Sequence, residues 1–384
     1  MALLRSPAAR AVATKAVSVA KLLLLLLLVW VGIGLVTVSV IAMGCGGRPE
    51  DRKVAPVAVP QRAQVTAGLA EYARPEADSY FSYPEWYIVW SYQEKAAFQA
   101  THLPSGFPYA GAIGQYWSAY CTVNRLAQGK YGFHAPAHVM LIVIGTSFTV
   151  EYALKGAYEK TIGRISEWLG AHQMVEEDAF AAQVARQYAD FVLVRPFYEF
   201  SFLKRFTALW NDTPLLGRHL LRKLERRLFL SFDYAVEAFY CELIELATRL
   251  AYGVAGADTY AWLENVRDAV WVENPHVRRV RQAGPGSYVA IIPRYQEFTP
   301  TAIRLAERGV RFAEIAGNHE IVLSVLAPDP FNSDLAPGQL LFSSRVLSQP
   351  GRERLVVLSP VAGLHTVLAA LHARGLAVEH IYDY

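Results

Sequence analysis

Two histidines in this sequence have the spacing of metal ligands. His134 and His138 are four residues apart in the segment FHAPAH, so a helix would place both imidazoles on one face. Pro136 lies between them and fits a helix only in its first turn. A metal site needs roughly three or four converging ligands, and the neighbouring sequence supplies no third one. The pair is therefore a weak metal candidate, and we expect no cofactor.

A dense group of aromatic residues indicates a second kind of site. The stretch YFSYPEWYIVWSYQEKAAF, residues 80–98, has seven aromatic residues among its first thirteen. Ser82 and Glu85 have capping-box spacing, which predicts a helix over residues 83–100 with one aromatic face. Such a face suits core packing, an interfacial belt or the mouth of a ligand pocket. The candidate ligand or interface residues are Glu85, Trp86, Tyr87 and Trp90.

A basic segment near the middle of the chain has two interpretations. Residues 218–230, RHLLRKLERRLFL, combine five basic residues with a stripe of leucines, which in a helix can rest on anionic headgroups. Alternatively, Asp233, Glu237 and Glu245 pair with these cations inside a bundle. Glu237, Glu242 and Glu245 also form a candidate acid cluster for proton transfer, although a solvated face is more common. The candidate lipid contacts are Arg218, Arg222, Lys223, Arg226 and Arg227.

Motifs that name a reaction do not occur along the chain. We find no GxSxG, HExxH or Walker loop, and no GxGxxG between a strand and a helix. The net charge of +3, from 37 basic and 34 acidic residues, excludes the strong basic excess of a dedicated nucleic-acid binder. We therefore favour a protein that is not an enzyme and expect no nucleic-acid partner.

The N-terminal region predicts a membrane anchor. Residues 22–43 carry no charge and are long enough, at 1.5 Å per residue, to cross a hydrocarbon core of roughly 30 Å. The apolar core of a cleaved signal peptide is only about 7 to 15 residues long, so we expect a transmembrane helix. Residues 1–21 contain no acid, and we predict that this basic leader is cytoplasmic and that the bulk of the chain is extracytoplasmic. Residues 44–65 are a Gly, Pro and charge-rich linker.

Three cysteines are too few for a disulfide framework. A single bridge between Cys121 and Cys241 is open from the sequence. Cys45 follows the predicted span in the segment AMGC, which faintly resembles a lipoprotein processing site, so lipidation of Cys45 is a minor alternative to an uncleaved anchor.

Residues 66–282 repeat apolar positions at helical spacing, which predicts an aromatic-rich helical domain. Its most apolar part, residues 135–150, is 16 residues long and is followed by Glu151. A span needs about 20 residues, so we expect a buried core helix, with a re-entrant or interfacial helix as the alternative.

The C-terminal region, residues 283–384, contains an internal duplication. Residues 287–315 and 354–381 each run from a β-branched segment through a helical stretch to Leu-x-x-Arg-Gly and a second strand. Proline near the helix start and glycine just after its end suit those positions. Two βαβ units in tandem predict a ferredoxin-like α/β sandwich, a fold that hosts many unrelated functions.

Together these features predict a membrane-anchored α+β protein with one transmembrane helix, a helical domain and a ferredoxin-like domain. We expect a single-pass membrane protein that acts as a non-catalytic assembly, scaffold or ligand-binding component of the cell envelope. Its expected partners are the lipid bilayer and a protein, or a second copy, bound through the C-terminal domain. The alternative is a membrane-associated enzyme, or a redox or metal-binding component, with a pocket in the helical domain.

Overall fold

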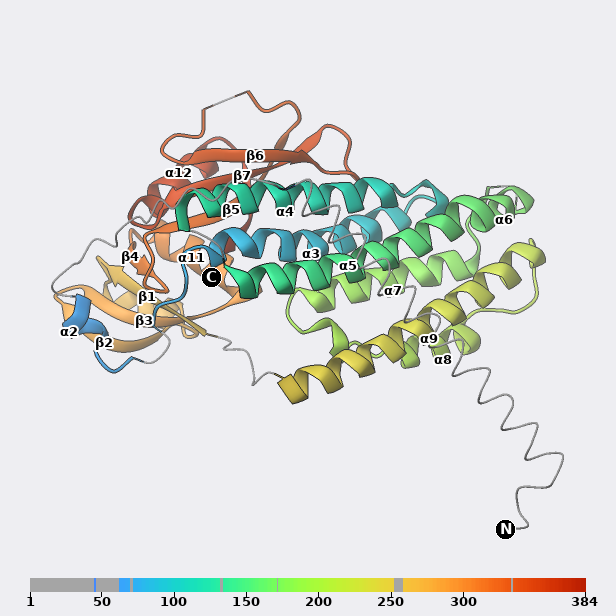
Figure 1. Cartoon of the computed structure of the whole chain (residues 1–384), viewed down its shortest axis with the longest axis horizontal. Helices are drawn as coiled ribbons and strands as arrows, with labels where there is room; N and C mark the ends of the chain where they lie inside the picture. Colours follow the sequence, from blue (N-terminus) through green and yellow to red (C-terminus); the bar gives the residue numbers. More distant parts are fainter. Residues whose placement is uncertain are drawn as a thin grey trace, which may run out of the picture.

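The computed structural model describes residues 45, 62–69, 72–131, 134–170, 172–251, 258–332 and 334–384. The predicted leader and the predicted anchor at residues 22–43 lie outside these ranges. The described chain combines helices with two antiparallel β-sheets, so the fold is α+β. In Figure 1 the long helices from α3 to α9 extend to one side of the molecule, and the sheets form the other side together with α2, α11 and α12.

The helical domain is built around one central helix. This helix, α3, contacts α4, α5 and α7, while α9 packs on α6, α7 and α8. Helix α5 continues through a π-helical turn, η3, into α6, and this continuous helix over Ala135–Leu169 is long and apolar enough to span a membrane. The elements of the helical domain are α3 (Asp78–Gln99), η2 (Pro104–Gly106), α4 (Tyr109–Tyr131), α5 (Ala135–Tyr158), η3 (Glu159–Gly163), α6 (Arg164–Leu169), α7 (Glu176–Val192), η4 (Phe197–Glu199), α8 (Phe202–Asp212) and α9 (Leu220–Ala251). The short helix α2 (Arg62–Thr66) precedes them and contacts β2 of the first sheet.

Helix α3 begins five residues earlier than the predicted start at residue 83. Asp78 lies in its first turn, and Ser82 is already inside the helix, where its hydroxyl donates to the carbonyl of Asp78 at 2.9 Å. The expected capping box is therefore not used. Pro84 falls inside the helix, so the carbonyl of Tyr80 has no backbone N–H to accept at the usual position.

Two sheets with the same strand order make up the C-terminal domain. The order is β2-β3-β1-β4 in the first sheet and β6-β7-β5-β8 in the second. The first contains β1 (Asp258–Glu264), β2 (Arg278–Gly284), β3 (Ser287–Pro293) and β4 (Arg311–Ile315), with α10 (Asp268–Glu273), η5 (Tyr295–Glu297) and α11 (Phe298–Glu307). The second contains β5 (Glu320–Pro328), β6 (Gln339–Arg345), β7 (Arg352–Pro360) and β8 (Ala377–Tyr382), with η6 (Val361–Gly363) and α12 (Leu364–Ala373).

The expected ferredoxin-like strand order is present, but in two sheets rather than one. The two β-α-β segments are present as β3-α11-β4 and β7-α12-β8. In each, the two strands flank a third strand, β1 or β5, which precedes the duplicated segment in the sequence. Each repeat therefore completes its own sheet, whereas the sequence predicted one sheet for both. The first sheet follows the whole β-α-β-β-α-β order of a ferredoxin-like fold, β1-α10-β2-β3-α11-β4, and the second has the same strand order without a helix between β5 and β6 among the described residues. The domain also begins at Asp258 rather than at residue 283, because β1 and β2 belong to the first sheet.

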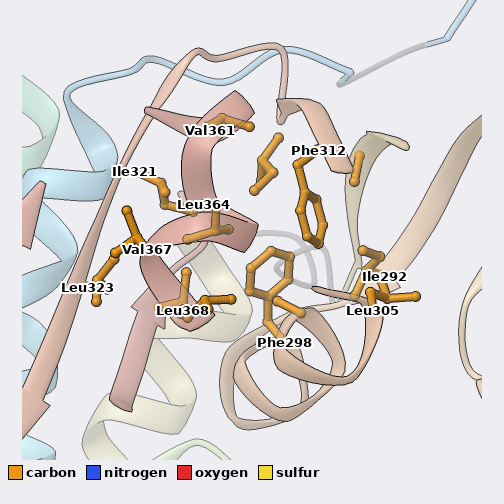
Figure 2. Packing of buried hydrophobic residues seen from close by; sticks show 14 of the residues in the cluster. Ile292, Phe298, Leu305, Phe312, Ile321, Leu323, Val361, Leu364, Val367 and Leu368 are labelled. Atoms are coloured by element: carbon orange, nitrogen blue, oxygen red, sulfur yellow. The ribbon is translucent and has the colours of Figure 1, made fainter. Parts of the chain in front are cut away.

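One apolar core joins the two repeats. Helices α11 and α12 contact each other, and buried side chains from both sheets surround them. Figure 2 shows Phe298 and Phe312 from the first repeat close to Leu364 and Leu368 from the second. Neither repeat buries this face alone, so the two fold as one domain.

The second sheet is buried on both faces because α3 covers its other side. Along β5 and β7, Leu323 and Val357 face the shared core, while Val322 and Val356 pack with the aromatic residues of α3. Tyr83 of α3 adds edge-to-face contacts to aromatic rings on β6 and β8. The aromatic stretch is therefore the packed seam between the helical and C-terminal domains.

Candidate functional site

Helix α9 has its polar and apolar faces reversed relative to a helix of a water-soluble protein. Arg222, Lys223, Arg226 and Arg227 are each at most 2% exposed. Between residues 220 and 246 of α9, the only charged residue with an exposed side chain is Glu242. The large exposed side chains of this helix are Leu220, Leu221, Leu224, Leu228, Phe232, Val236, Phe239, Leu243 and Leu246. From Leu221 onward they recur every three or four residues and form a continuous stripe.

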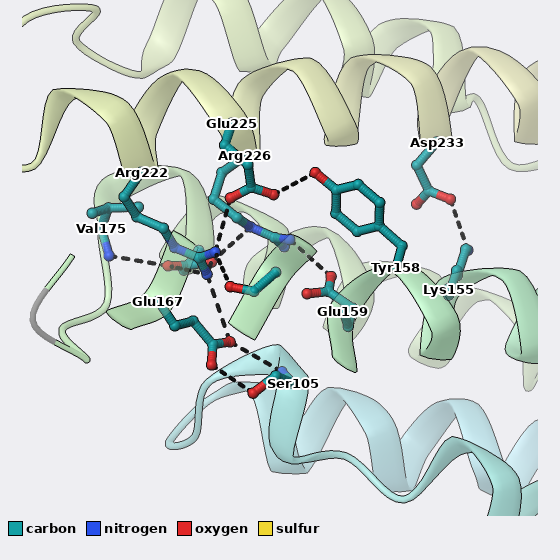
Figure 3. A network of polar contacts seen from close by, with 12 residues as sticks. Ser105, Lys155, Tyr158, Glu159, Glu167, Val175, Arg222, Glu225, Arg226 and Asp233 are labelled. Carbon is teal, nitrogen blue, oxygen red and sulfur yellow. Dashed lines mark hydrogen bonds and ion pairs between the residues drawn. The ribbon is translucent and has the colours of Figure 1, made fainter. Parts of the chain in front are cut away.

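The buried cations of α9 are held by acids from neighbouring helices (Figure 3). Asp178 binds both Arg222 Nη2 at 3.0 Å and Arg226 Nε at 2.8 Å. Arg226 Nη1 also contacts Glu159 at 2.8 Å. The remaining pairs are Arg227 with Glu177, Lys223 with Glu176, and Arg222 with Glu225 and Glu167.

These contacts change the interpretation of the basic segment. Four of the five expected lipid contacts, Arg222, Lys223, Arg226 and Arg227, are inside the domain and do not form an exposed cationic surface. Arg218, which precedes α9, is exposed. Ion pairing inside a bundle was the second interpretation, but most of the partners lie on η3, α6 and α7 rather than on the acids expected along α9.

A second charged cluster adjoins this network. Lys155 Nζ lies 2.9 Å from Glu151, 3.1 Å from Asp233 and 2.8 Å from Glu237. A cavity of about 60 Å³ lies beside these residues, and Lys95 also lines it. Burial raises the pKa of Glu237 to about 7, although Lys155 opposes that shift. Burial and the charge of Lys155 lower the pKa of Lys95.

The size of this cavity limits its chemistry. A water needs about 10 to 15 Å³ of such space, so the cavity holds a few waters and excludes an organic substrate. Glu237 can exchange a proton near neutral pH, and Tyr92 donates a hydrogen bond to Glu151 at 2.6 Å. The cluster is therefore suited to holding or moving a proton.

The four aromatic-stretch candidates do not converge on one pocket. Trp86 stacks on the buried His380 at 3.7 Å between ring centroids and packs on Trp90 at 5.3 Å. Tyr87 is directed toward α4, where its hydroxyl donates to Gln115 at 2.9 Å. Glu85 is exposed. Trp90 lines a cavity between α3 and the second sheet.

The histidine pair is not assembled as a metal site. His138 is 4% exposed, and its Nδ1 lies 3.0 Å from the hydroxyl of Tyr120. His134 lies 3.5 Å from Asp78. No group of three or more metal-ligating side chains occurs within the described ranges.

The cysteines pair differently from the bridge left open by the sequence. Cys45 and Cys121 form a disulfide, and Cys241 is free and buried. The bridge connects a residue just after the predicted anchor to the middle of α4. A bridged Cys45 has no thiol left for lipidation.

Sequence reasoning missed the second cluster and a third buried ion pair at the domain seam. Arg354 of β7 is 2% exposed and binds Glu94 of α3 and Glu379 of β8. Of these groups, only Asp233 and Glu237 were singled out from the sequence. Isolated acids within apolar helical segments, such as Glu94 and Glu151, were the available signal, because an acid on a buried face requires a partner.

Comparison with known proteins gives no identity for the chain. No protein-family model, curated protein or solved structure shows significant similarity to it.

Proposed function

We propose that this protein is a membrane-anchored scaffold or ligand-binding component of the cell envelope, and that its helical domain rests on the bilayer through α5, α6 and α9. The reversed α9 carries this proposal. Large apolar residues that face outward, above a buried network of charges, are the pattern expected of a surface whose solvent is lipid. A soluble monomer rarely exposes more than a few hundred Å² of contiguous apolar surface.

The apolar stripes of α5 and α9 face the same side. The two helices are antiparallel neighbours, as shown by the Lys155–Asp233 ion pair and by the stacking of Tyr158 on Phe229. Leu154, 66% exposed, immediately precedes Lys155, and Phe232, 69% exposed, immediately precedes Asp233. Successive residues turn by roughly 100°, and antiparallel helices turn in opposite senses when viewed from one end. Leu154 and Phe232 therefore project toward the same side of the helix pair.

Helix α6 extends this surface. The exposed residues Ile162, Ile165, Trp168 and Leu169 continue the stripe of α5, together with Lys160 and Arg164. Tryptophan beside cations is typical of the interface between bilayer and water. A single face over α5, α6 and α9 thus has the composition of a membrane contact.

The polar residues exposed on α7 favour a helical domain that lies on the bilayer surface over one that crosses the bilayer. Helix α7 exposes Glu176, Gln183, Arg186 and Asp190 along its length. These side chains would be costly in hydrocarbon, whereas they are compatible with water if only the α5–α9 side is inserted. This arrangement corresponds to the interfacial alternative for residues 135–150.

The disulfide supports both the location and the side of the membrane. Disulfides persist in oxidising compartments, in agreement with an extracytoplasmic domain. Trp117, one turn before Cys121, donates a hydrogen bond to Thr149 of α5, so Cys121 lies on the side of α4 that adjoins α5. Cys45, which is two residues past the predicted anchor, is thereby bonded to the helix that packs on α5.

The C-terminal domain remains the proposed site for a protein partner or a second copy. Strand β6 is an edge strand of the second sheet and exposes Leu340. The enzymatic alternative has less support, because the cavity of the helical domain is only large enough for waters.

Site-specific labelling in bilayers tests this proposal. A fluorescent thiol label on Phe232→Cys or Val143→Cys is expected to be quenched by lipids brominated on their acyl chains. The matched control is Gln183→Cys on α7, which should report water, and the buried Cys241 should not be labelled. Equal exposure of all three labels to aqueous quenchers would disprove membrane contact.

A further inference from the structure

The end of the helical domain farthest from the sheets is formed by α6, the start of α9 and the segment that joins α8 to α9 (Figure 1). Arg227 Nη2 donates to the carbonyl of Thr213 at 2.9 Å, and Arg222 lies 3.8 Å from Glu167 of α6. The start of α9 therefore holds both neighbouring segments in place. We call residues 160–169 and 213–221 the tip.

The tip exposes large apolar side chains outside its helices as well as on them. Leu215 and Leu216 belong to no helix or strand and are 48% and 76% exposed. A connecting segment that meets water is normally polar, and the amphipathic spacing of a helix does not account for two exposed leucines in a loop. This segment is therefore a second indication, independent of the stripe on α9, that this end of the domain contacts an apolar medium.

Three exposed cations surround these apolar residues. Lys160 and Arg164 are four residues apart and share one side of the continuous helix with the exposed Trp168. Arg218 follows the loop leucines and is also exposed. None of the three cations has an ion-pair partner among the described residues. By contrast, the exposed Arg186 of α7 pairs with an acid four residues further along.

The acids near the tip do not neutralise these cations. The exposed acids at this end of the domain are Asp212, at the end of α8, and Glu176, at the start of α7. Glu176 is bound to Lys223 at 3.0 Å, so its charge is already compensated. Positive charge is therefore in local excess around an apolar surface, which is the combination that binds bilayers containing anionic lipids.

We propose that the tip enters the bilayer surface and that Lys160, Arg164 and Arg218 bind the headgroups of anionic lipids. The inference rests on the proposed membrane contact and names the lipid class that this contact selects. Ammonium and guanidinium groups donate to headgroup phosphate oxygens, while the neighbouring apolar side chains enter the acyl boundary. The disulfide joins the segment after the predicted anchor to α4, so the tip is a second point of attachment that fixes the tilt of the domain.

Lipid quenching at the tip tests the inference. A fluorescent thiol label on Leu216→Cys is placed in full-length protein in nanodiscs whose lipids are brominated on their acyl chains. One set contains phosphatidylcholine alone, and the other contains equal amounts of phosphatidylcholine and phosphatidylglycerol. We expect stronger quenching in the anionic nanodiscs and a loss of that difference at high salt. Cys45 and Cys121 are bridged and Cys241 is buried, so the introduced cysteine is labelled selectively.

Neutralising the cations gives the sharper test. Lys160→Gln, Arg164→Gln and Arg218→Gln should each lower the ratio of inserted to free tip in anionic nanodiscs by up to about fivefold. The effect should be absent in phosphatidylcholine alone. These side chains are exposed and have no described ion-pair partner, so the substitutions leave the fold intact.

A triple variant away from the tip is the matched control. Arg186→Gln, Arg195→Gln and Arg374→Gln change the net charge as much as the three tip substitutions together, and all three side chains are exposed. They should leave the quenching at residue 216 unchanged. An equal loss in this control would overturn the inference, because the effect would then depend on net charge and not on the tip.

Equal quenching at residue 216 in the two lipid compositions would also overturn the selection of anionic lipids. A label on Phe232→Cys separates the two proposals. If residue 232 is quenched while residue 216 reports water in both compositions, only the inference about the tip fails. If both residues report water, the membrane contact fails and the inference fails with it.

Discussion

The two domains of this protein distribute charge in opposite ways. In α9, the arginines at 222 and 226 are at most 1% exposed, while Leu228 and Phe232 are 65% and 69% exposed. In β7, Leu355 and Val357 are at most 1% exposed, as in a water-soluble domain, and the buried Arg354 of this strand lies at the seam with α3. Both arrangements follow from the same rule, that the polarity of each face of an element matches the polarity of what it contacts. The difference supports the proposal that the helical domain contacts lipid while the C-terminal domain contacts water.

The two interiors also differ in how substitutions should act. Buried ion pairs contribute little net stability relative to a well-packed apolar core, but removal of one partner leaves a charge without compensation. An apolar core loses transfer free energy and gains a cavity when it is truncated. Substitutions inside each domain therefore sharpen the comparison.

The largest effect is expected from Arg226→Met in the helical domain. This change leaves Glu159 and Asp178 without one of their cations, and we expect the free energy of unfolding to fall by about 3 to 5 kcal/mol. Denaturant unfolding of the full-length protein in detergent measures it. The control is Arg186→Met on the exposed face of α7, which should cost less than about 0.5 kcal/mol. Similar losses in both variants would contradict the buried network.

A loss of about 2 to 5 kcal/mol is expected from Leu323→Ala in the C-terminal domain. Leu323 is fully buried in the core that the two repeats share. Because this core is apolar, the loss should not depend on salt. Denaturant unfolding at low and high salt measures it, and a loss below about 1 kcal/mol for Leu323→Ala would contradict tight packing there.

The sequence predicted the kinds of elements better than their partners. Helical spacing and the duplicated Leu-x-x-Arg-Gly endings indicated the helices and the two β-α-β segments, because these signals are local. The pairing of β3 and β4 with β1 depends on contacts between distant residues, and no local pattern specifies it. Two sheets were therefore predicted as one.

The candidate sites show the same limit. The leucine stripe of residues 218–230 was visible in the sequence, but which face is buried depends on acids such as Glu159 and Asp178 on other helices. Trp86 and Trp90 were recognised as one aromatic face, whereas their contact with His380 joins residues almost 300 positions apart. Arg354 gave no signal, since a single arginine in a strand segment has no spacing to interpret.

A smaller effect is expected on the pH dependence of stability, through His380, which is buried at the seam between the domains. His380 is fully buried, and burial lowers its pKa to about 3. In the unfolded chain a histidine has a pKa near 6.5, so between about pH 3 and pH 6.5 it binds a proton that the folded chain does not bind. The free energy of unfolding therefore falls as the pH falls below about 6.5. When the pH is lowered from about 7 to about 5, His380 should reduce the free energy of unfolding by about 2 kcal/mol.

Comparison with His380→Phe isolates that contribution. Asp383 responds in the opposite direction, because burial raises its pKa to about 6, but it is present in both proteins. The difference in unfolding free energy between the two proteins should therefore change by about 2 kcal/mol over this pH range. An unchanged difference would show that His380 is accessible to protons in the folded state.

The smallest effect on stability is expected from Leu228→Gln combined with Phe232→Gln on the apolar face of α9. Both side chains are already exposed, so in detergent the free energy of unfolding should change by no more than about 0.5 kcal/mol. In bilayers the same double variant should shift a label at residue 143 toward water, because two large apolar contacts with lipid are lost. Leu340→Gln on β6, also exposed, is the matched control and should leave that label unchanged. If the double variant destabilised the protein in detergent by several kcal/mol, the stripe would instead be packed against protein, and the opposition between the two domains would disappear.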